Sequence, residues 1–135
     1  MGLTFGVERQ ISQIWADVSK IAGGNVSAFR ATATSTTPLA VTVKSTTGYW
    51  ALLDVKLHLS AAGSTGSLQV KIDSGTAAAY DTLLLSESLT AVTDIYWQPT
   101  RPIEFSASDE VDITWESSPG SSAITYGLEA TYKTL

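Results

Sequence analysis

The sequence predicts an all-β protein: an antiparallel, jelly-roll-like β-sandwich of about eight strands, preceded by one short α-helix. Apolar and polar residues alternate with a period of two through most of residues 25–135, which is the spacing of strands with one buried face. Glycine, proline, serine and aspartate separate these segments at intervals of roughly ten to twelve residues, as in sandwiches and barrels. Only the first two dozen residues follow a helical spacing instead.

Residues 1–24 are predicted to form the helix and to act as an oligomerisation arm, separate from a β-sandwich domain of residues 25–135. β-Branched residues recur at alternating steps of four and three and occupy both core positions of a heptad: Val7, Ile11, Ile14, Val18 and Ile21. Such a seam favours trimers over two-stranded coils, and Gly23 ends the helix. The alternative is an amphipathic helix that packs on its own domain.

The first half of the β domain contains four alternating segments separated by turn residues: 26–33, 39–43, 49–60 and 68–72. In the longest of them the odd-numbered apolar residues, from Leu53 to Leu59, are expected on the core face, and the even-numbered polar residues on the opposite face. Gly63 and Gly66 indicate the hairpin that leads to the fourth segment.

The second half contributes the remaining strands, predicted at 80–85, 93–98, 103–105, 111–115 and 126–132. Pro99 and Pro102 end the segment 93–98, because proline has no backbone N–H to donate to a neighbouring strand. Val111, Ile113 and Trp115 alternate with polar residues and therefore belong to the core. An immunoglobulin-like sandwich is the alternative topology, although the chain has no cysteine pair.

Composition excludes several functional classes. The net charge is −5 and no run of lysine or arginine occurs, so nucleic-acid binding is not expected. The absence of cysteine excludes a disulfide framework, a thiol nucleophile and a cysteine-ligated zinc. No apolar run reaches the length of a membrane span and no signal peptide is evident, so no membrane partner is expected.

Catalytic chemistry has few candidates. His58 is the only histidine, and alternation places it on the face opposite Leu57 and Leu59, where it is expected to face solvent. No nucleophile-elbow spacing supplies a serine that this histidine could activate. We therefore expect no catalytic residues, no enzymatic activity and no cofactor.

Carboxylates form two small groups, at Asp73 and Asp81 and at Asp109, Glu110 and Asp112. Opposed carboxylates serve hydrolases, and several together can bind calcium. Here the spacing matches no metal-binding loop, and short acidic side chains commonly bond the backbone amides of turns. We expect turn chemistry and no metal site.

Aromatic residues offer an alternative function, because exposed flat rings can stack on sugars. Trp97 and Trp115 follow core parity and are expected to point inward, whereas Trp50 and Tyr49 begin a strand, where one ring is expected at a rim. Trp50 and the N-terminal residues Leu3, Phe5 and Trp15 are the candidate contacts with a partner.

The stretch 49–132 resembles small β-sandwich proteins of tailed-bacteriophage virions, through the strings 51–60, 67–78, 80–82, 93–99, 108–115 and 125–129. The resemblance implies a jelly roll, commonly trimeric, that decorates or cements capsids or serves as a tail or fibre adaptor. It implies a virion location after synthesis in the host cytoplasm, and it supplies no catalytic residues.

Together these observations predict a homotrimeric capsid decoration or cement protein that binds the head exterior, with the major capsid protein or another virion protein as partner. A tail or fibre adaptor would use the same fold and trimer. A carbohydrate-binding module would bind a glycan through an exposed aromatic strip and would not need the N-terminal seam.

Overall fold

The computed structural model describes residues 25–45, 48–115 and 122–135. Over these residues the elements are β1 (Asn25–Ser35), β2 (Ala40–Val43), β3 (Trp50–Leu59), β4 (Ser67–Asp73), the 3₁₀ turn η1 (Ala78–Tyr80), β5 (Thr82–Ser88), β6 (Asp94–Trp97), β7 (Ile103–Phe105), β8 (Glu110–Trp115) and β9 (Ile124–Thr134). The predicted helix 1–24 lies outside the described residues. With it lie the predicted interface residues Val7, Ile11, Ile14, Val18 and Ile21 and the predicted contacts Leu3, Phe5 and Trp15.

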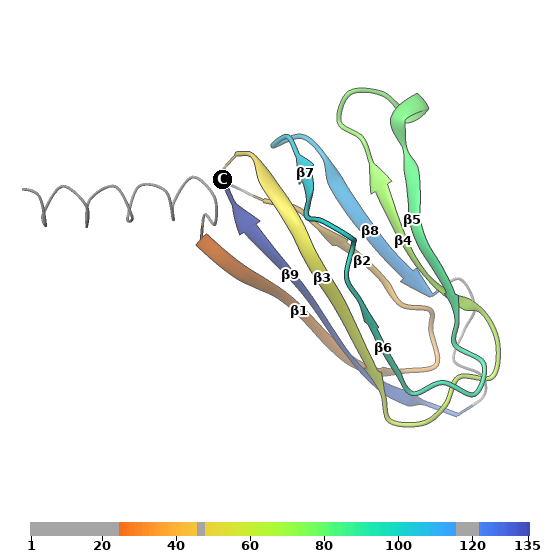
Figure 1. Ribbon diagram of the computed structural model, residues 1–135. Coiled ribbons are helices and arrows are strands. Elements are labelled where there is room, and N and C mark those ends of the chain that lie inside the picture. Colours follow the sequence, from red (N-terminus) through yellow and green to blue (C-terminus); the bar gives the residue numbers. More distant parts are fainter. Residues whose placement is uncertain (1–24, 46–47, 116–121) are drawn as a thin grey trace, which may run out of the picture.

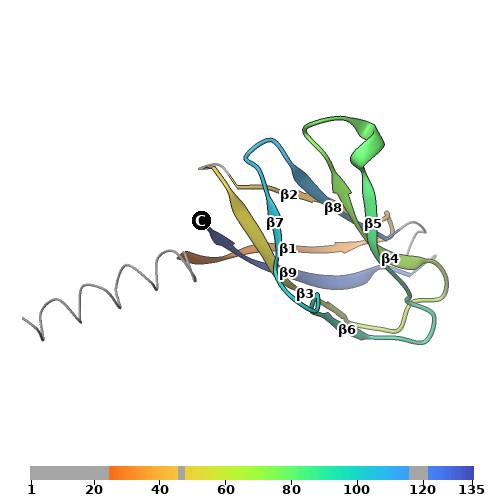
Figure 2. The ribbon, with the colours of Figure 1, turned by 45° about the horizontal axis from the view of Figure 1, so that its top comes forward.

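The strands form two antiparallel sheets packed face to face (Figure 1). The five-stranded sheet has the order β1-β9-β3-β6, with β7 paired to the first half of β3, and the four-stranded sheet has the order β2-β8-β4-β5. In Figure 2, β2, β8 and β5 lie above β1, β9 and β6. The predicted all-β sandwich is confirmed.

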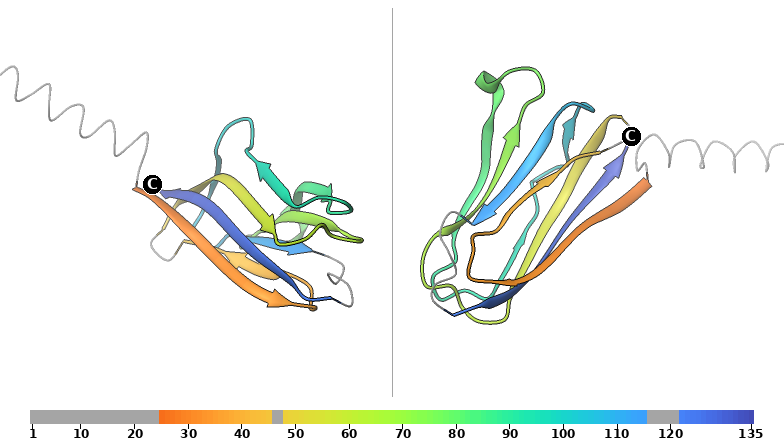
Figure 3. Two further views of the ribbon diagram at one scale, coloured as in Figure 1. Left: turned by 90° about the horizontal axis from the view of Figure 1, so that it is seen from below. Right: turned by 180° about the vertical axis from the view of Figure 1, so that it is seen from behind.

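The pairing is that of a long hairpin wound into two layers. The first strand pairs with the last, β2 with β8, β3 with β6 and β7, and β4 with β5. This nested order is a jelly roll, in which β6 and β7 together take the place of one strand. Figure 3 shows β1 and β9, the orange and blue strands, side by side, with residue 25 and the C-terminus at the same end.

Alternation explains which residues fill the core. In β8, Val111, Ile113 and Trp115 are fully buried while the residues between them are half-buried. The Trp115 indole N–H donates to the Thr65 carbonyl oxygen over 2.8 Å, so its burial leaves no unpaired donor. Trp97 packs half-buried against the same core, which agrees with its predicted inward direction.

A β-bulge in β3 corrects the prediction for Trp50. Between Leu52 and Asp54 the register with β9 shifts by one residue, so that the extra residue, Leu53, is only half-buried. The bulge puts the even-numbered Trp50 on the same inner face as the odd-numbered Val55. Trp50 is therefore 0% exposed, and its predicted role as a partner contact is wrong.

The exposed aromatic ring beside the start of β3 is instead that of Tyr49, which is 68% exposed. The Trp50 ring lies 4.6 Å from that of Phe105 and 5.7 Å from that of Tyr132, measured between centroids, so the indole belongs to an inner aromatic cluster. A stacking platform for sugars cannot include it.

The segment predicted as a strand over 80–85 begins later and ends later, as β5. The amides of Tyr80 and Asp81 donate to the carbonyl oxygens of Ala77 and Ala78, which forms the 3₁₀ turn η1 and removes Tyr80 from the strand. Asp81 then bonds the Ser74 amide through its carboxylate, which fixes the turn before β5.

Candidate functional site

Two rows of side chains cross the outer face of the five-stranded sheet. Antiparallel register places residues of β1, β9, β3 and β6 opposite one another, and the two rows are two residues apart along each strand. We call them the charged row (Arg30, Glu129, Lys56 and Tyr96) and the glycine row (Thr32, Gly127, His58 and Asp94).

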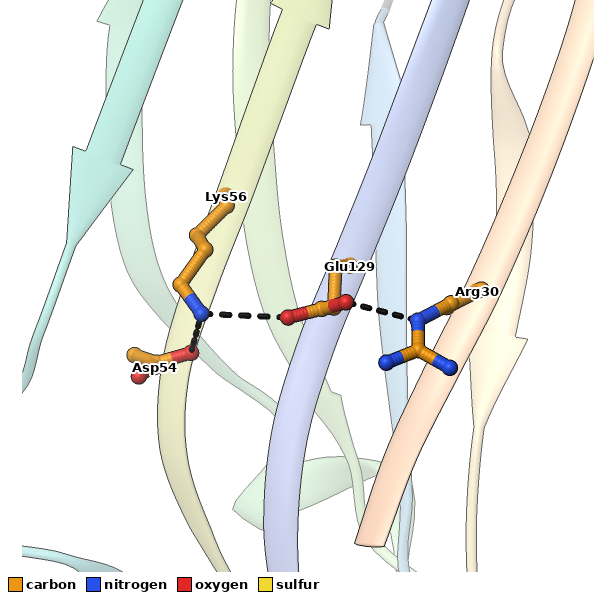
Figure 4. Close-up of polar contacts among 4 residues, drawn as sticks. All are labelled: Arg30, Asp54, Lys56 and Glu129. Carbon is orange, nitrogen blue, oxygen red and sulfur yellow. Dashed lines mark hydrogen bonds and ion pairs between the residues drawn. The ribbon is translucent and has the colours of Figure 1, made fainter.

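The charged row is an ion-pair network (Figure 4). Arg30 Nε donates to Glu129 Oε2 over 2.7 Å, Lys56 Nζ donates to Glu129 Oε1 over 3.1 Å, and Asp54 Oδ1 lies 3.8 Å from Lys56 Nζ. The hydrogen bond from Arg30 lowers the pKa of Glu129, and the bond to Glu129 raises the pKa of Lys56. Because Arg30 and Lys56 are well exposed, the network fixes side-chain orientation more than it stabilises the fold.

The glycine row contains a gap in the side-chain layer. A β-carbon built on Gly127 would meet no atom within 4 Å, so the space above this residue is open. Thr32 of β1 and His58 of β3 are its neighbours on the two adjacent strands. Glycine within a strand commonly indicates a close approach of something to the backbone.

His58 and Asp94 form a bonded pair at one side of this gap. His58 Nδ1 lies 2.6 Å from Asp94 Oδ1, and Thr93 Oγ1 donates to Asp94 Oδ2 over 2.8 Å. The bond with His58 is the main cause that lowers the pKa of Asp94. Leu57 and Leu59 are buried and His58 is exposed, as alternation predicted.

Together the rows enclose a shallow hollow of about 450 Å³. Gly127 and the backbone of β9 lie in its middle, and Arg30, Lys56, His58, Asp94 and Tyr96 lie around it. Tyr96 is 61% exposed and is the aromatic ring of the hollow. Sequence reasoning missed this site, because only long-range pairing brings Gly127, His58 and Arg30 together. The available signals were the glycine inside a strand and the outward parity of Tyr96 between Ile95 and Trp97.

The carboxylates at the loop ends divide into two kinds: Asp81 and Asp109 bond backbone amides of turns, as predicted, whereas Glu110 accepts from Lys44 and Asp112 from the Thr42 hydroxyl. Asp109 accepts hydrogen bonds from the amides of Gly75 and Ser106, each over 2.9 Å, and so ties two loops together. Burial alone would raise the pKa of Asp109, but these hydrogen bonds outweigh it and lower the pKa. For Asp73, burial and then the charge of Asp81 raise the pKa. Within the described ranges, no group of three or more histidine, cysteine or acidic residues could hold a metal ion.

The two sides of the sandwich are open. One side ends in β1 and β2, the other in β5 and β6, and we call these the β1/β2 seam and the β5/β6 seam. Most of the partly buried apolar residues that pack on the core lie on these four strands: Phe29, Ala31, Ala33, Val41, Leu84, Leu85 and Trp97. Within residues 25–45, 48–115 and 122–135, the core is therefore incompletely covered along both sides.

No protein-family model matches the chain, and no curated protein sequence matches it. Among solved structures, it is similar to the crystal structure of the Drosophila NLP core, with a TM-score of 0.49 and 11% identity over 82% of this chain and 98% of that one. That structure is described as giving insight into pentamer formation and histone binding, which are statements about the Drosophila protein. None of the helices in the part of the chain that the structure describes is long and apolar enough to cross a membrane.

The predicted capsid decoration function, homotrimer and capsid-protein partner are corrected here, because these comparisons give them no support. No family model or curated sequence matches, and the similar solved structure is described in terms of pentamer formation and histone binding. The resemblance to phage virion proteins and the virion location stay predictions, as do the absence of catalysis and of nucleic-acid binding.

Proposed function

We propose that this chain is a structural, non-catalytic module that assembles side by side with further copies of itself. The observation that carries the proposal is the incompletely covered core at the two seams. Edge strands present unpaired N–H and C=O groups, and a side with half-buried apolar residues gains free energy when another surface covers it.

The β5/β6 seam has the more apolar edge. Leu83, Leu84 and Leu85 follow one another in β5, and a register shift opposite Val70 and Lys71 interrupts strict alternation there. Leu84 and Leu85 pack on the core, whereas Leu83 points outward and is 52% exposed. Monomeric proteins avoid an exposed apolar edge strand of this kind, so a partner surface is expected to cover it.

Charge favours the β1/β2 seam of another copy as the partner. The only charged residue of β1 and β2 is Arg30, and Lys44 follows β2 directly; β5 and β6 carry only Glu87 and Asp94. Opposite charges at the two seams favour contact between unlike sides and disfavour contact between like sides. Such a head-to-tail contact generates a closed ring of copies when the rotation permits closure.

The geometry around the only histidine supports a role without catalysis. Asp94 bonds His58 Nδ1, but among the described contacts no serine or threonine hydroxyl bonds His58 Nε2, and the nearby Thr93 hydroxyl donates to Asp94 instead, so no hydroxyl is placed for activation as a nucleophile. Turnover on a panel of ester and glycoside substrates would contradict this part of the proposal.

Solution mass tests the assembly. Light scattering after gel filtration is expected to give a multiple of the 14.3 kDa chain mass, and Leu83→Lys is expected to shift the protein to single chains. Leu135→Lys is the matched control, because Leu135 is a similarly exposed leucine outside the seams. A wild-type protein that is a single chain at every concentration would overturn the proposal.

A charge-reversal series locates the contact. Glu87→Lys and Lys44→Glu are each expected to weaken assembly by placing like charges against each other, and the double variant is expected to restore it. Ile14→Asp tests the N-terminal heptad separately. If Ile14→Asp dissociates the assembly and Leu83→Lys leaves it intact, the seams are not the contact.

A further inference from the structure

We propose that the hollow above Gly127 binds a neutral saccharide. The site lies on the outer face of the five-stranded sheet, whereas the seams lie at its sides, so it is independent of the proposed assembly. Its residues come from four neighbouring strands, β1, β9, β3 and β6, and therefore stand on a rigid platform.

The floor of the site is backbone. Gly127 leaves the centre of the face without a side chain, and nothing fills the volume that its β-carbon would occupy. A flat ligand can therefore approach β9 closely between Thr32 and His58. The volume of about 450 Å³ lies in the lower part of the range for small-molecule sites and suits one or two sugar rings.

The charges around the floor are already paired. Arg30 and Lys56 both bond Glu129, and Asp94, which bonds His58, adds a second carboxylate, so with a neutral histidine the two cations and two anions of the lining cancel and offer no net charge to an ionic ligand. Pairing still leaves hydrogen-bonding capacity, because Arg30 uses only Nε and His58 only Nδ1 among the described contacts. Groups that both donate and accept hydrogen bonds match this mixture, and sugar hydroxyls do both.

An aromatic ring completes the site. Tyr96 is exposed, belongs to the charged row opposite Lys56 and lines the hollow. The C–H face of a pyranose ring is apolar, and a flat aromatic side chain can bury it while the hydroxyls reach the polar groups. The combination of an apolar ring, an open backbone floor and paired planar polar groups distinguishes a saccharide from an anion or a cation.

The test titrates the full chain with methyl glycosides of glucose, galactose and mannose and follows backbone amide shifts by NMR. At least one glycoside is expected to shift the Gly127 and Thr32 amides in a saturable way. Gly127→Thr fills the hollow with a residue that suits a strand, and is expected to weaken binding at least tenfold. Tyr96→Ala is expected to do the same, whereas Tyr96→Phe keeps the ring and is expected to keep binding.

Two controls keep the result specific. Tyr49→Ala removes an equally exposed ring outside the hollow, and Thr131→Val changes the outer face of β9 away from it; both are expected to leave binding unchanged. Unchanged amide spectra with all three glycosides would overturn the proposal. So would saturable shifts of the same amides with acetate or methylammonium but not with the glycosides, because that result identifies an ion site.

Discussion

The two sheets of this sandwich solve the same packing problem differently. The five-stranded sheet buries most of its large apolar residues on the inner face, leaves Val26 and Tyr96 exposed, and pairs Arg30 and Lys56 with Glu129 on its outer face. The four-stranded sheet does so in β8 but ends in β5, where none of the seven residues is fully buried and three are consecutive leucines. Where apolar and polar residues alternate, the chain buries its own apolar side chains. Where the alternation fails, a partner is expected to cover them.

At the centre of the core, the two sheets are expected to be equally sensitive. Trp50 of the five-stranded sheet and Trp115 of the four-stranded sheet are both fully buried. Trp50→Ala and Trp115→Ala should each lower the free energy of unfolding by about 3–5 kcal/mol, because each leaves a large cavity. Urea denaturation followed by circular dichroism measures this, and a cost below about 1 kcal/mol at either position would contradict the packing described.

Substitution of the same two tryptophans by phenylalanine should give different losses of stability in the two sheets. Trp115→Phe removes the bond to the Thr65 carbonyl, whereas the Trp50 indole nitrogen has no acceptor among the described residues. The loss at position 115 should therefore exceed that at position 50 by about 1–2 kcal/mol. Equal losses in urea denaturation would show that the Thr65 bond adds nothing to stability.

Gly75, in the loop after β4, and Gly127, within β9, should respond to alanine with opposite changes in stability. A β-carbon at Gly75 would collide with the carbonyl oxygen and side chain of Ser108, so Gly75→Ala should destabilise by about 1–3 kcal/mol. Gly127→Ala meets open space and should stabilise by about 0.4–1 kcal/mol, because it restricts the unfolded chain. Differential scanning calorimetry of the two variants checks the signs, and destabilisation by Gly127→Ala would mean that the hollow is filled.

Two aspartates at one end of the four-stranded sheet, Asp73 and Asp109, should affect the stability of the protein in acid in opposite directions. The pKa of Asp109 is lowered in the folded protein, so its stabilising effect is present above the ordinary aspartate pKa and is lost as the pH falls through the lowered value. The pKa of Asp73 is raised, so the folded protein takes up this proton first and gains relative stability as the pH falls.

Asp109→Asn should therefore reduce the loss of unfolding free energy between about pH 7 and about pH 3, whereas Asp73→Asn should enlarge it. Urea titrations at both pH values provide the measurement. The same change in both variants would contradict the assigned environments.

The smallest effect is expected in the charged row. Glu129→Gln removes the negative charge and one of the two oxygens that accept from Arg30 and Lys56, yet both partners are well exposed. The loss of stability should be below about 1 kcal/mol and should shrink further in 1 M salt. A larger loss, measured by thermal denaturation, would mean that the network is more strongly shielded from water than its exposure indicates.

Local pattern was enough to predict the sandwich, the inward direction of Trp115 and the outward direction of His58. It failed at Trp50, because the bulge at Leu53 arises from how β3 pairs with β9, and that pairing joins residues far apart in the sequence. The hollow could not be predicted for the same reason, since Gly127 acquires its neighbours only through register with β1 and β3. The heptad of residues 7–21 stays a prediction.

The pairing of the first strand with the last has a consequence for synthesis on the ribosome. The Arg30–Glu129 contact spans 99 residues of sequence, so β1 has no neighbour until nearly the whole chain has been made. At roughly 5–20 residues per second, translation leaves β1 waiting for about 5–20 s. During that time the five-stranded layer cannot close, because it lacks β9, and the leucines of β5 emerge before the strand that completes the domain. Slow translation or high local concentration of nascent chains should therefore favour premature contacts between copies over completion of each one.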